Sequence, residues 1–201
     1  MAFKKRFTNT NKTTKKVTSK KGGPIYKAKD GSRYRSKAMR DYHEVLAADK
    51  NVKSFELATV ENEEKMLNKR FGAFKVKVNG ITFDSVMESK FYVYLLGMKA
   101  KRRIKSFERQ VTYELQPGFI DAEGKKILPI KYIADFVVTD KNGDKQVIDI
   151  KGVETAEFIL KKKLFKYIHR KTIFKCLQWV PKKNEWVDLE EIKKERKAKK
   201  K

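Results

Sequence analysis

The chain has 201 residues, with 50 Lys and Arg against 25 Asp and Glu, for a formal net charge of +25. This length suffices for one α/β domain with appendages, and the charge predicts a polyanionic partner, most simply nucleic acid. The single cysteine, Cys176, excludes an internal disulfide and fits a reducing compartment. Two histidines argue against zinc fingers, and no apolar run is long enough to span a membrane. A ribosomal-type RNA-binding protein without chemistry is compatible with the same composition.

The chain begins with a basic arm. Residues 1–23 contain no acid and cannot bury a core, so we expect this arm to be disordered when free. The arm either contacts the phosphates of a nucleic acid or is only a solubility or expression tail.

Residues 24–70 form a predicted N-terminal α/β unit that resembles a weaker copy of the next segment of the chain. YKAKDGSRYRSKAMRDYHEVL aligns with FKVKVNGITFDSVMESKFYVYL at a constant offset. We interpret this as a degenerate duplication rather than a chance similarity. Met39 of the first copy stands where the second copy has the acid Glu88. We therefore predict that the unit binds DNA through Arg33, Arg35 and Arg40 but has no catalytic role.

Residues 71–187 form the predicted core. Apolar periodicity indicates a hairpin through Phe74–Phe83, a helix to about Ala100, a long strand over 104–116, a hairpin over 132–152, a helix over 155–171 and a strand over 173–180. Residues 117–126 are predicted to form a loop, and 188–201 a basic C-terminal helix and tail. This order predicts an α/β fold with a central mixed sheet flanked by helices.

Two basic clusters of this core are candidates for phosphate contact. One lies at the end of the first helix and one on the second; their members are Lys101, Arg102, Arg103, Lys161, Lys162 and Lys163.

The hairpin YIADFVVTDKNGDKQVIDIKG carries the main functional signal. Asp135 and Asp149 each interrupt an apolar strand, although strand interiors disfavour Asp and burial of a lone carboxylate is costly. Lys151 comes two residues after Asp149 and projects from the same face.

Loop length decides whether these acids meet. A two-residue Asn142-Gly143 loop would place Asp135 and Asp149 on opposite faces, because strand side chains alternate. A three-residue loop pairs them directly, about 5 Å apart, and requires positive φ at Gly143. We predict the three-residue loop and a shared divalent metal, Mg²⁺ with Mn²⁺ as a substitute.

Asp135 followed a hairpin later by Asp149-Ile150-Lys151 resembles the PD-(D/E)xK nuclease motif, with Ala134 in place of Pro. The run from Phe83 to Trp179 also resembles small phage-encoded endonucleases, which are similar to the endonuclease I type of Holliday-junction resolvase. The resemblance implies a restriction-endonuclease-like core. It also implies metal ligation by Asp135, Asp149 and the backbone carbonyl of Ile150, and a water oriented by Lys151.

The superfamily usually adds an acid on a preceding helix, and Glu88 matches it, binding the metal directly or through water. Ser85 and Glu88 also form an S-x-x-E capping box, which explains Glu88 without a metal.

The expected function is a Mg²⁺-dependent DNA endonuclease, structure-selective for branched or junction DNA, in phage DNA recombination or processing. If the chain is phage-encoded, its location is the cytoplasm of a bacterial host. Alternatives are a sequence-specific homing or restriction-type nuclease, a transposase-subunit nuclease, and a non-catalytic basic DNA-binding protein. The substrate, the number of metals and the oligomeric state, including a homodimer, stay open.

Overall fold

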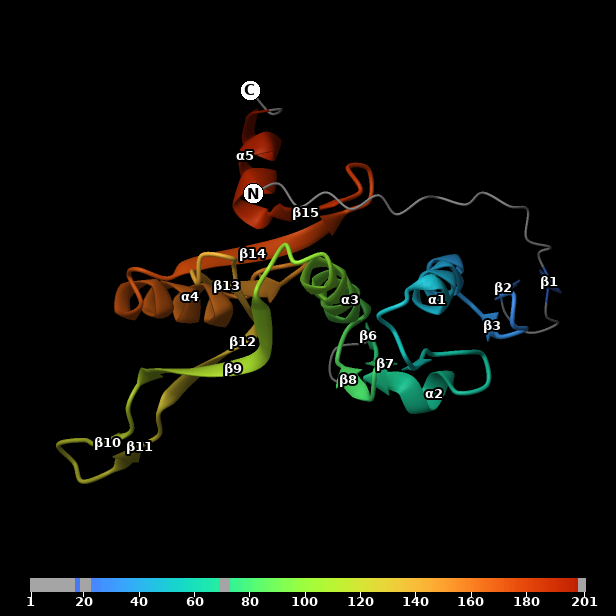
Figure 1. The fold of residues 1–201 in the computed structure, drawn as a ribbon. Coiled ribbons are helices and arrows are strands. Elements are labelled where there is room, and N and C mark those ends of the chain that lie inside the picture. The colour runs from blue at the N-terminus through green and yellow to red at the C-terminus, as the bar shows by residue number, and fades with distance from the viewer. Residues whose placement is uncertain (1–16, 19–22, 69–72, 199–201) are drawn as a thin grey trace. The chain divides into compact units, whose positions relative to one another are not determined.

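The computed structural model describes residues 17–18, 23–68 and 73–198 (Figure 1). The described chain forms two compact units, one ending at Gly97 and one beginning at Met98. The predicted arm at 1–23 lies outside the described residues except at 17–18 and 23, as does the end of the tail at 199–201. Among the described helices, none combines the length and apolar character that crossing a membrane requires.

The N-terminal unit contains two hairpins that are each followed by a helix. In the first, β2 (Pro24–Lys27) pairs with β1 (Val17–Thr18) and β3 (Arg33–Tyr34), and α1 (Lys37–Ala48) comes next. In the second, β7 (Val76–Val78) pairs with β8 (Ile81–Phe83), and α3 (Val86–Ala100) comes next. The order of hairpin and helix is therefore the same in both segments, and the duplication stays a prediction.

One strand pairing joins residues from the two sides of the predicted boundary at residue 70. β4 (Phe55–Glu56), which comes after the first copy, pairs antiparallel with β7 of the second copy. The helical stretch expected over residues 61–70 contains only α2 (Glu63–Met66), followed by the short pair β5 (Leu67–Asn68) and β6 (Ala73–Phe74).

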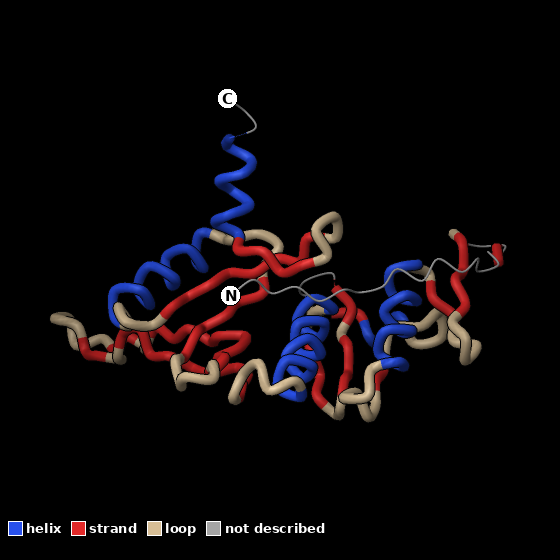
Figure 2. Tube along the Cα trace, turned by 45° about the horizontal axis from the view of Figure 1, so that its top comes forward, coloured by secondary structure: helices blue, strands red, loops and turns tan. Residues whose placement is uncertain are grey.

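The C-terminal unit is built on a five-stranded sheet with the order β15-β14-β13-β12-β9 (Figures 1 and 2). Only β13 and β14 run parallel, so the sheet is mixed, and the α/β prediction with flanking helices is confirmed. The elements of this unit are β9 (Ser106–Gln116), β10 (Phe119–Ile120), β11 (Lys126–Ile127), β12 (Ile130–Thr139), β13 (Lys145–Ile150), α4 (Ala156–Ile168), β14 (Ile173–Val180), β15 (Glu185–Asp188) and α5 (Leu189–Ala198).

Helix α4 covers one face of this sheet. The Thr155 hydroxyl caps it by accepting a hydrogen bond from the Phe158 N–H at 3.2 Å. Phe165 is fully buried and meets the rings of Tyr132 and Phe174 at centroid distances of 5.7 and 5.1 Å. Burial of each such aromatic side chain contributes about 2–3 kcal/mol, so this layer anchors α4 to the strands that carry the two acids.

The β12–β13 hairpin has the predicted three-residue loop. Its strands pair from Phe136 with Ile148 to Thr139 with Lys145, and the Asp140 N–H donates to the Asp144 carbonyl at 3.0 Å. Gly143 has φ +95°, as the loop requires.

We expect Gly143→Ala to lower the free energy of unfolding by about 1–2 kcal/mol, because an L-residue is strained in the left-handed region. Gly152→Ala is the matched control, since Gly152 has no positive φ and no neighbouring atom within 4 Å of an added Cβ. Urea denaturation of both variants measures the difference. Equal stabilities would contradict the three-residue loop.

Candidate active site

Asp135 and Asp149 occupy opposed positions of the β12–β13 hairpin. Continuing the observed register by one residue beyond Phe136 and Ile148 pairs the two acids directly. Asp135 is 8% exposed and Asp149 is 1% exposed. Two carboxylates at such depth require compensating partners, because each loses most of its hydration.

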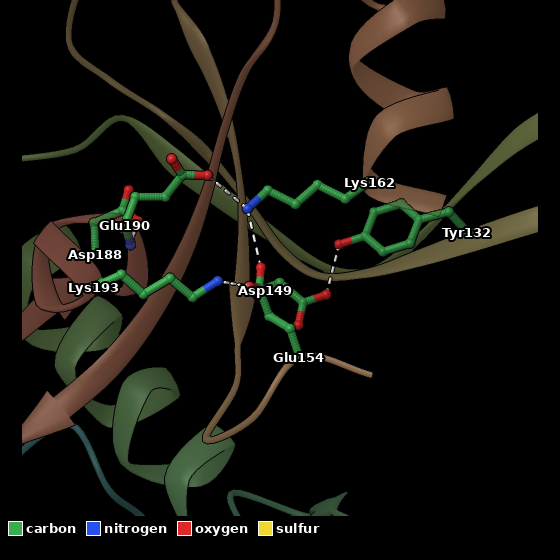
Figure 3. Close-up of polar contacts among 7 residues, drawn as sticks. All are labelled: Tyr132, Asp149, Glu154, Lys162, Asp188, Glu190 and Lys193. Atoms are coloured by element: carbon green, nitrogen blue, oxygen red, sulfur yellow. Dashed lines mark hydrogen bonds and ion pairs between the residues drawn. The ribbon is translucent and has the colours of Figure 1, made fainter. Parts of the chain in front are cut away.

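Asp149 is held by a tyrosine from the core. The Tyr132 hydroxyl donates to Asp149 Oδ2 at 2.6 Å (Figure 3). Burial, together with the neighbouring Asp149 carboxylate, raises the pKa of Tyr132 above its usual range, so this hydroxyl stays a donor. Asp149 also pairs in register with Cys176, a buried residue of the same core layer. Burial raises the pKa of Cys176 to about 12, which fits an inert structural thiol.

The side chain of Asp135 takes the place of a backbone hydrogen-bond acceptor where the pairing of β12 with β13 ends. Its Oδ2 accepts a hydrogen bond from the Ile150 N–H at 2.8 Å. An ionised acceptor makes a stronger hydrogen bond than a carbonyl. Asp135 is thereby fixed against the strand that carries Asp149 and Lys151.

The Lys151 ammonium lies between the two acids. Its Nζ is 2.9 Å from Asp149 Oδ1 and 3.9 Å from Asp135 Oδ2. The same Nζ lies 5.4 Å from the centre of the Phe158 ring, which adds a cation–π contact. The three predicted residues Asp135, Asp149 and Lys151 therefore converge.

These residues fit a divalent cation in part. The ammonium already occupies a position where positive charge balances two carboxylates, and Asp149 Oδ1 is buried without a well-aligned hydrogen-bond donor. Among the described residues, however, no three His, Cys, Asp or Glu side chains gather into a metal-binding group. Two carboxylates suffice for Mg²⁺ only because this ion keeps several waters.

Glu88 lies on the first turn of α3, in the N-terminal unit. Its N–H donates to Ser85 Oγ at 3.2 Å, and the Ser85 hydroxyl donates to Glu88 Oε1 at 3.0 Å. These contacts agree with the expected capping role. The metal-binding role of Glu88 stays a prediction.

The strand opposite Asp135 is distorted at one residue. Gln110 of β9 has φ +51°, in the left-handed region that non-glycine residues rarely adopt, and the register places it across from Asp135. Strict alternation on β12 would put Val137 on the other face from Tyr132 and Ala134, yet all three belong to one buried cluster. On β12, the side chains that pack into this cluster therefore change from even-numbered to odd-numbered residues at Asp135.

The basic residues predicted to contact DNA in the N-terminal unit are already paired. Arg33 and Arg35 bond to Glu61 and Glu63 at 2.7 and 2.8 Å. Arg40 is buried and lies 2.8 Å from Asp41. For Arg40 in particular, the structure indicates a role inside the unit rather than at its surface.

In the C-terminal unit, the predicted basic residues differ in exposure. Lys101, Arg102 and Arg103 are exposed, as is Lys163, while Lys161 pairs with Glu157 at 2.8 Å. Lys162, in contrast, is 9% exposed. The prediction that Lys162 contacts phosphate conflicts with this burial.

Lys162 instead belongs to an ion-pair network with Glu154, Glu190 and Lys193 (Figure 3). Its Nζ lies 3.1 Å from Glu154 and 3.0 Å from Glu190, and Lys193 also bonds Glu154. Burial alone would lower the pKa of Lys162, but the hydrogen bonds to Glu190 and Glu154 outweigh it and raise that pKa. The network ties α5 to α4 and to the segment after Lys151.

Sequence reasoning missed Tyr132 and this network. Tyr132 has the pattern of an ordinary core aromatic, and nothing local connects it to a residue 17 positions later. Lys162 lies 28 positions from Glu190, beyond any helical spacing. The one local signal was Glu154, which with Glu157 is one of two acids at the start of a segment rich in lysine.

We expect Lys162→Met to lower the free energy of unfolding by about 2–3 kcal/mol, because it leaves Glu154 buried with fewer cationic partners. The adjacent, exposed Lys163→Met is the matched control and should change stability by less than about 0.5 kcal/mol. Thermal or urea denaturation measures both. If the two variants are equally stable, the network is not structural.

We also expect Gln110→Gly to leave stability unchanged or raise it by up to about 1 kcal/mol, because glycine relieves the left-handed strain. Thr112→Gly, at an exposed position of the same strand, should lower stability by about 1 kcal/mol. Urea denaturation again measures both variants. Losses of equal size would show that Gln110 is not strained in solution.

The comparisons with known proteins add a family but no activity. No curated protein matches the sequence. A protein family matches residues 68–186, more than half of the chain, and this span includes Glu88, Asp135, Asp149 and Lys151. The chain therefore belongs to the family described as "Protein of unknown function (DUF1064)".

Proposed function

We propose that the protein is a metal-dependent endonuclease that hydrolyses phosphodiester bonds in DNA. The observation that carries the proposal is the convergence of Asp135, Asp149 and Lys151 at one buried point of a strongly basic protein. Two opposed carboxylates with a lysine two residues further on are the constellation of the PD-(D/E)xK motif. The mixed sheet is compatible with the restriction-endonuclease-like core that this motif implies.

Each residue would have a distinct role. Asp135 and Asp149 would hold the cation, with the Ile150 carbonyl as a further predicted ligand. A bound Mg²⁺ would supply charge neutralisation at the phosphate and acidify a bound water. Lys151 would move from its contact with Asp149 to orient the attacking water, and Tyr132 would hold the Asp149 carboxylate aligned for the cation.

The surface charge supports DNA as the polyanion. Exposed basic side chains lie on the same unit as the two acids, at Lys101, Arg102, Arg103 and Lys163. Such side chains neutralise phosphates and release counterions, so affinity should fall steeply with salt. Lys163→Met should reduce the slope of log K against log salt by about 0.9, the value for one duplex phosphate contact.

One observation favours a non-catalytic alternative. Lys151 already neutralises Asp149, so the cluster could be a structural ion pair in a DNA-binding protein. The two functions differ in one measurable respect, because only the nuclease needs the carboxylates for turnover.

We expect Asp149→Asn to reduce Mg²⁺-dependent cleavage of supercoiled plasmid to below about 1% of wild type, because the variant loses a charged metal ligand. DNA affinity should be retained, since no phosphate contact is removed. Asp144→Asn, on the exposed end of the same hairpin, is the control and should cut normally. Unchanged cleavage by Asp149→Asn would refute the assignment, and absence of cleavage by the wild type would favour the alternative.

A further inference from the structure

Helix α4 carries a stripe of exposed residues on the side that faces away from the sheet. The helix lies along one face of the five-stranded sheet (Figure 1), and Phe158 and Phe165 pack into the buried cluster between them. Leu160, Lys163 and Tyr167 lie about half a turn away from these two rings, because 3.6 residues make one turn. Leu160 is 58% exposed and Tyr167 is 68% exposed. The proposed function uses only the lysine of this stripe.

Arg170 is held over the Tyr167 ring by a hydrogen bond to the backbone of the same residue. Its Nε donates to the Tyr167 carbonyl at 3.1 Å, and the carbon at the centre of its guanidinium lies 4.9 Å from the ring centre. This is a cation–π contact, and both side chains are exposed. Two planar groups are therefore held together at the surface, where a further planar group could stack on them.

The stripe is positively charged and has no acid of its own. The sequence over residues 158–184 contains no Asp or Glu. Among the described residues, the ion pairs of α4 that involve its lysines are made by Lys161 and Lys162, and neither Lys163 nor Arg170 forms one. Both of these charges are exposed and are therefore available to an anionic partner.

Lys166, which is also exposed, is not counted in this stripe. The pKa of Glu190 in α5 is lowered mainly by its hydrogen bond with Lys162, and the charge of Lys166 adds to that effect. Part of the charge of Lys166 is therefore balanced by an acid of α5.

We propose that this stripe binds single-stranded nucleic acid, with an unpaired base stacked on Tyr167 and Arg170 and its phosphate on Lys163. Aromatic rings and arginine side chains provide stacking platforms of this kind for single strands in general. Tyr167 and Lys163 are four residues apart on the helix, so their side chains are neighbours and one nucleotide can reach both. The inference goes beyond the proposed cleavage, because it concerns binding that requires neither the metal nor the two acids.

A single strand fits this surface better than a duplex or a membrane does. In a duplex, the faces of the bases are covered by their stacked neighbours, so only the charges of Lys163 and Arg170 would find partners. A helix that lies in a membrane surface needs a continuous apolar face, whereas Lys163 lies between Leu160 and Tyr167 on this stripe. A single strand offers both phosphates and open base faces, so it uses the charges and the aromatic ring together.

The test compares two substitutions at one exposed position, Tyr167→Leu and Tyr167→Phe. Leucine removes the ring but stays apolar, whereas phenylalanine keeps the ring and loses only the hydroxyl. Affinities for an oligothymidylate and for an abasic strand with the same number of phosphates are measured by fluorescence anisotropy in EDTA. We expect Tyr167→Leu to lose about tenfold in affinity for the oligothymidylate and less than about twofold for the abasic strand. Tyr167→Phe should bind both strands within about twofold of the wild-type affinity.

Phe119→Leu is the matched control, because it removes an exposed aromatic ring from β10. This control should bind both strands with wild-type affinity, and an equal loss by the two leucine variants would overturn the proposal. A titration with oligouridylate distinguishes RNA from DNA as the bound strand. A loss of about tenfold by Tyr167→Leu on either strand supports the proposal, and a loss on neither overturns it.

Two further results would overturn the proposal. Equal wild-type affinities for the abasic strand and the oligothymidylate would show that only the charge of the surface matters. Binding of the wild type to anionic phospholipid vesicles that Tyr167→Leu abolishes, with strand binding unchanged, would assign the stripe to a membrane surface. The nuclease proposal fails or stands separately, because Asp149→Asn should keep the wild-type preference for oligothymidylate whether or not the wild type cleaves DNA.

Discussion

The burial of Asp149 is the constraint on which the C-terminal unit depends. A carboxylate that is 1% exposed must keep an ionic or hydrogen-bonding partner, or its burial would cost several kcal/mol. Tyr132 and Lys151 supply those partners, and each is fixed by the same core: Tyr132 packs among the aromatic rings beneath α4, and Lys151 lies over Phe158. Helix α4, which covers this core, therefore also positions the Tyr132 hydroxyl and the Lys151 ammonium beside Asp149.

A second layer of charge keeps the surrounding elements in place. Glu154 comes three residues after Lys151 and is held by lysines from α4 and α5. This arrangement restrains the backbone on the C-terminal side of the site, while Asp135 restrains it from β12. The acids and the lysine therefore have support from both sides, which favours a precise geometry.

Local rules were sufficient for the hairpin. The alternation of strand side chains and the preference for Gly at a left-handed position predicted the loop length and the register. They also predicted that Asp135, Asp149 and Lys151 lie close together. The same rules could not reveal the contacts of Tyr132 and Lys162 or the β10–β11 hairpin. Tyr132 and Lys162 make contacts with residues that are distant in the sequence. Pro117, Gly118 and Gly124 make residues 117–126 resemble the loop that was predicted there. These rules also could not reveal the contact across the predicted boundary at residue 70, where β4 pairs with a strand of the second copy.

The hydrogen bond from the Ile150 amide to Asp135 has a practical consequence. Most amides in a sheet point at carbonyls, whose charge does not change with solution conditions. This one points at a titratable oxygen that faces the site. Protonation of Asp135, or binding of a cation to it, therefore alters the electronic environment of a single backbone proton. The amide resonance of Ile150 is a natural spectroscopic reporter for the carboxylate, readable with uniform nitrogen labelling and no added probe.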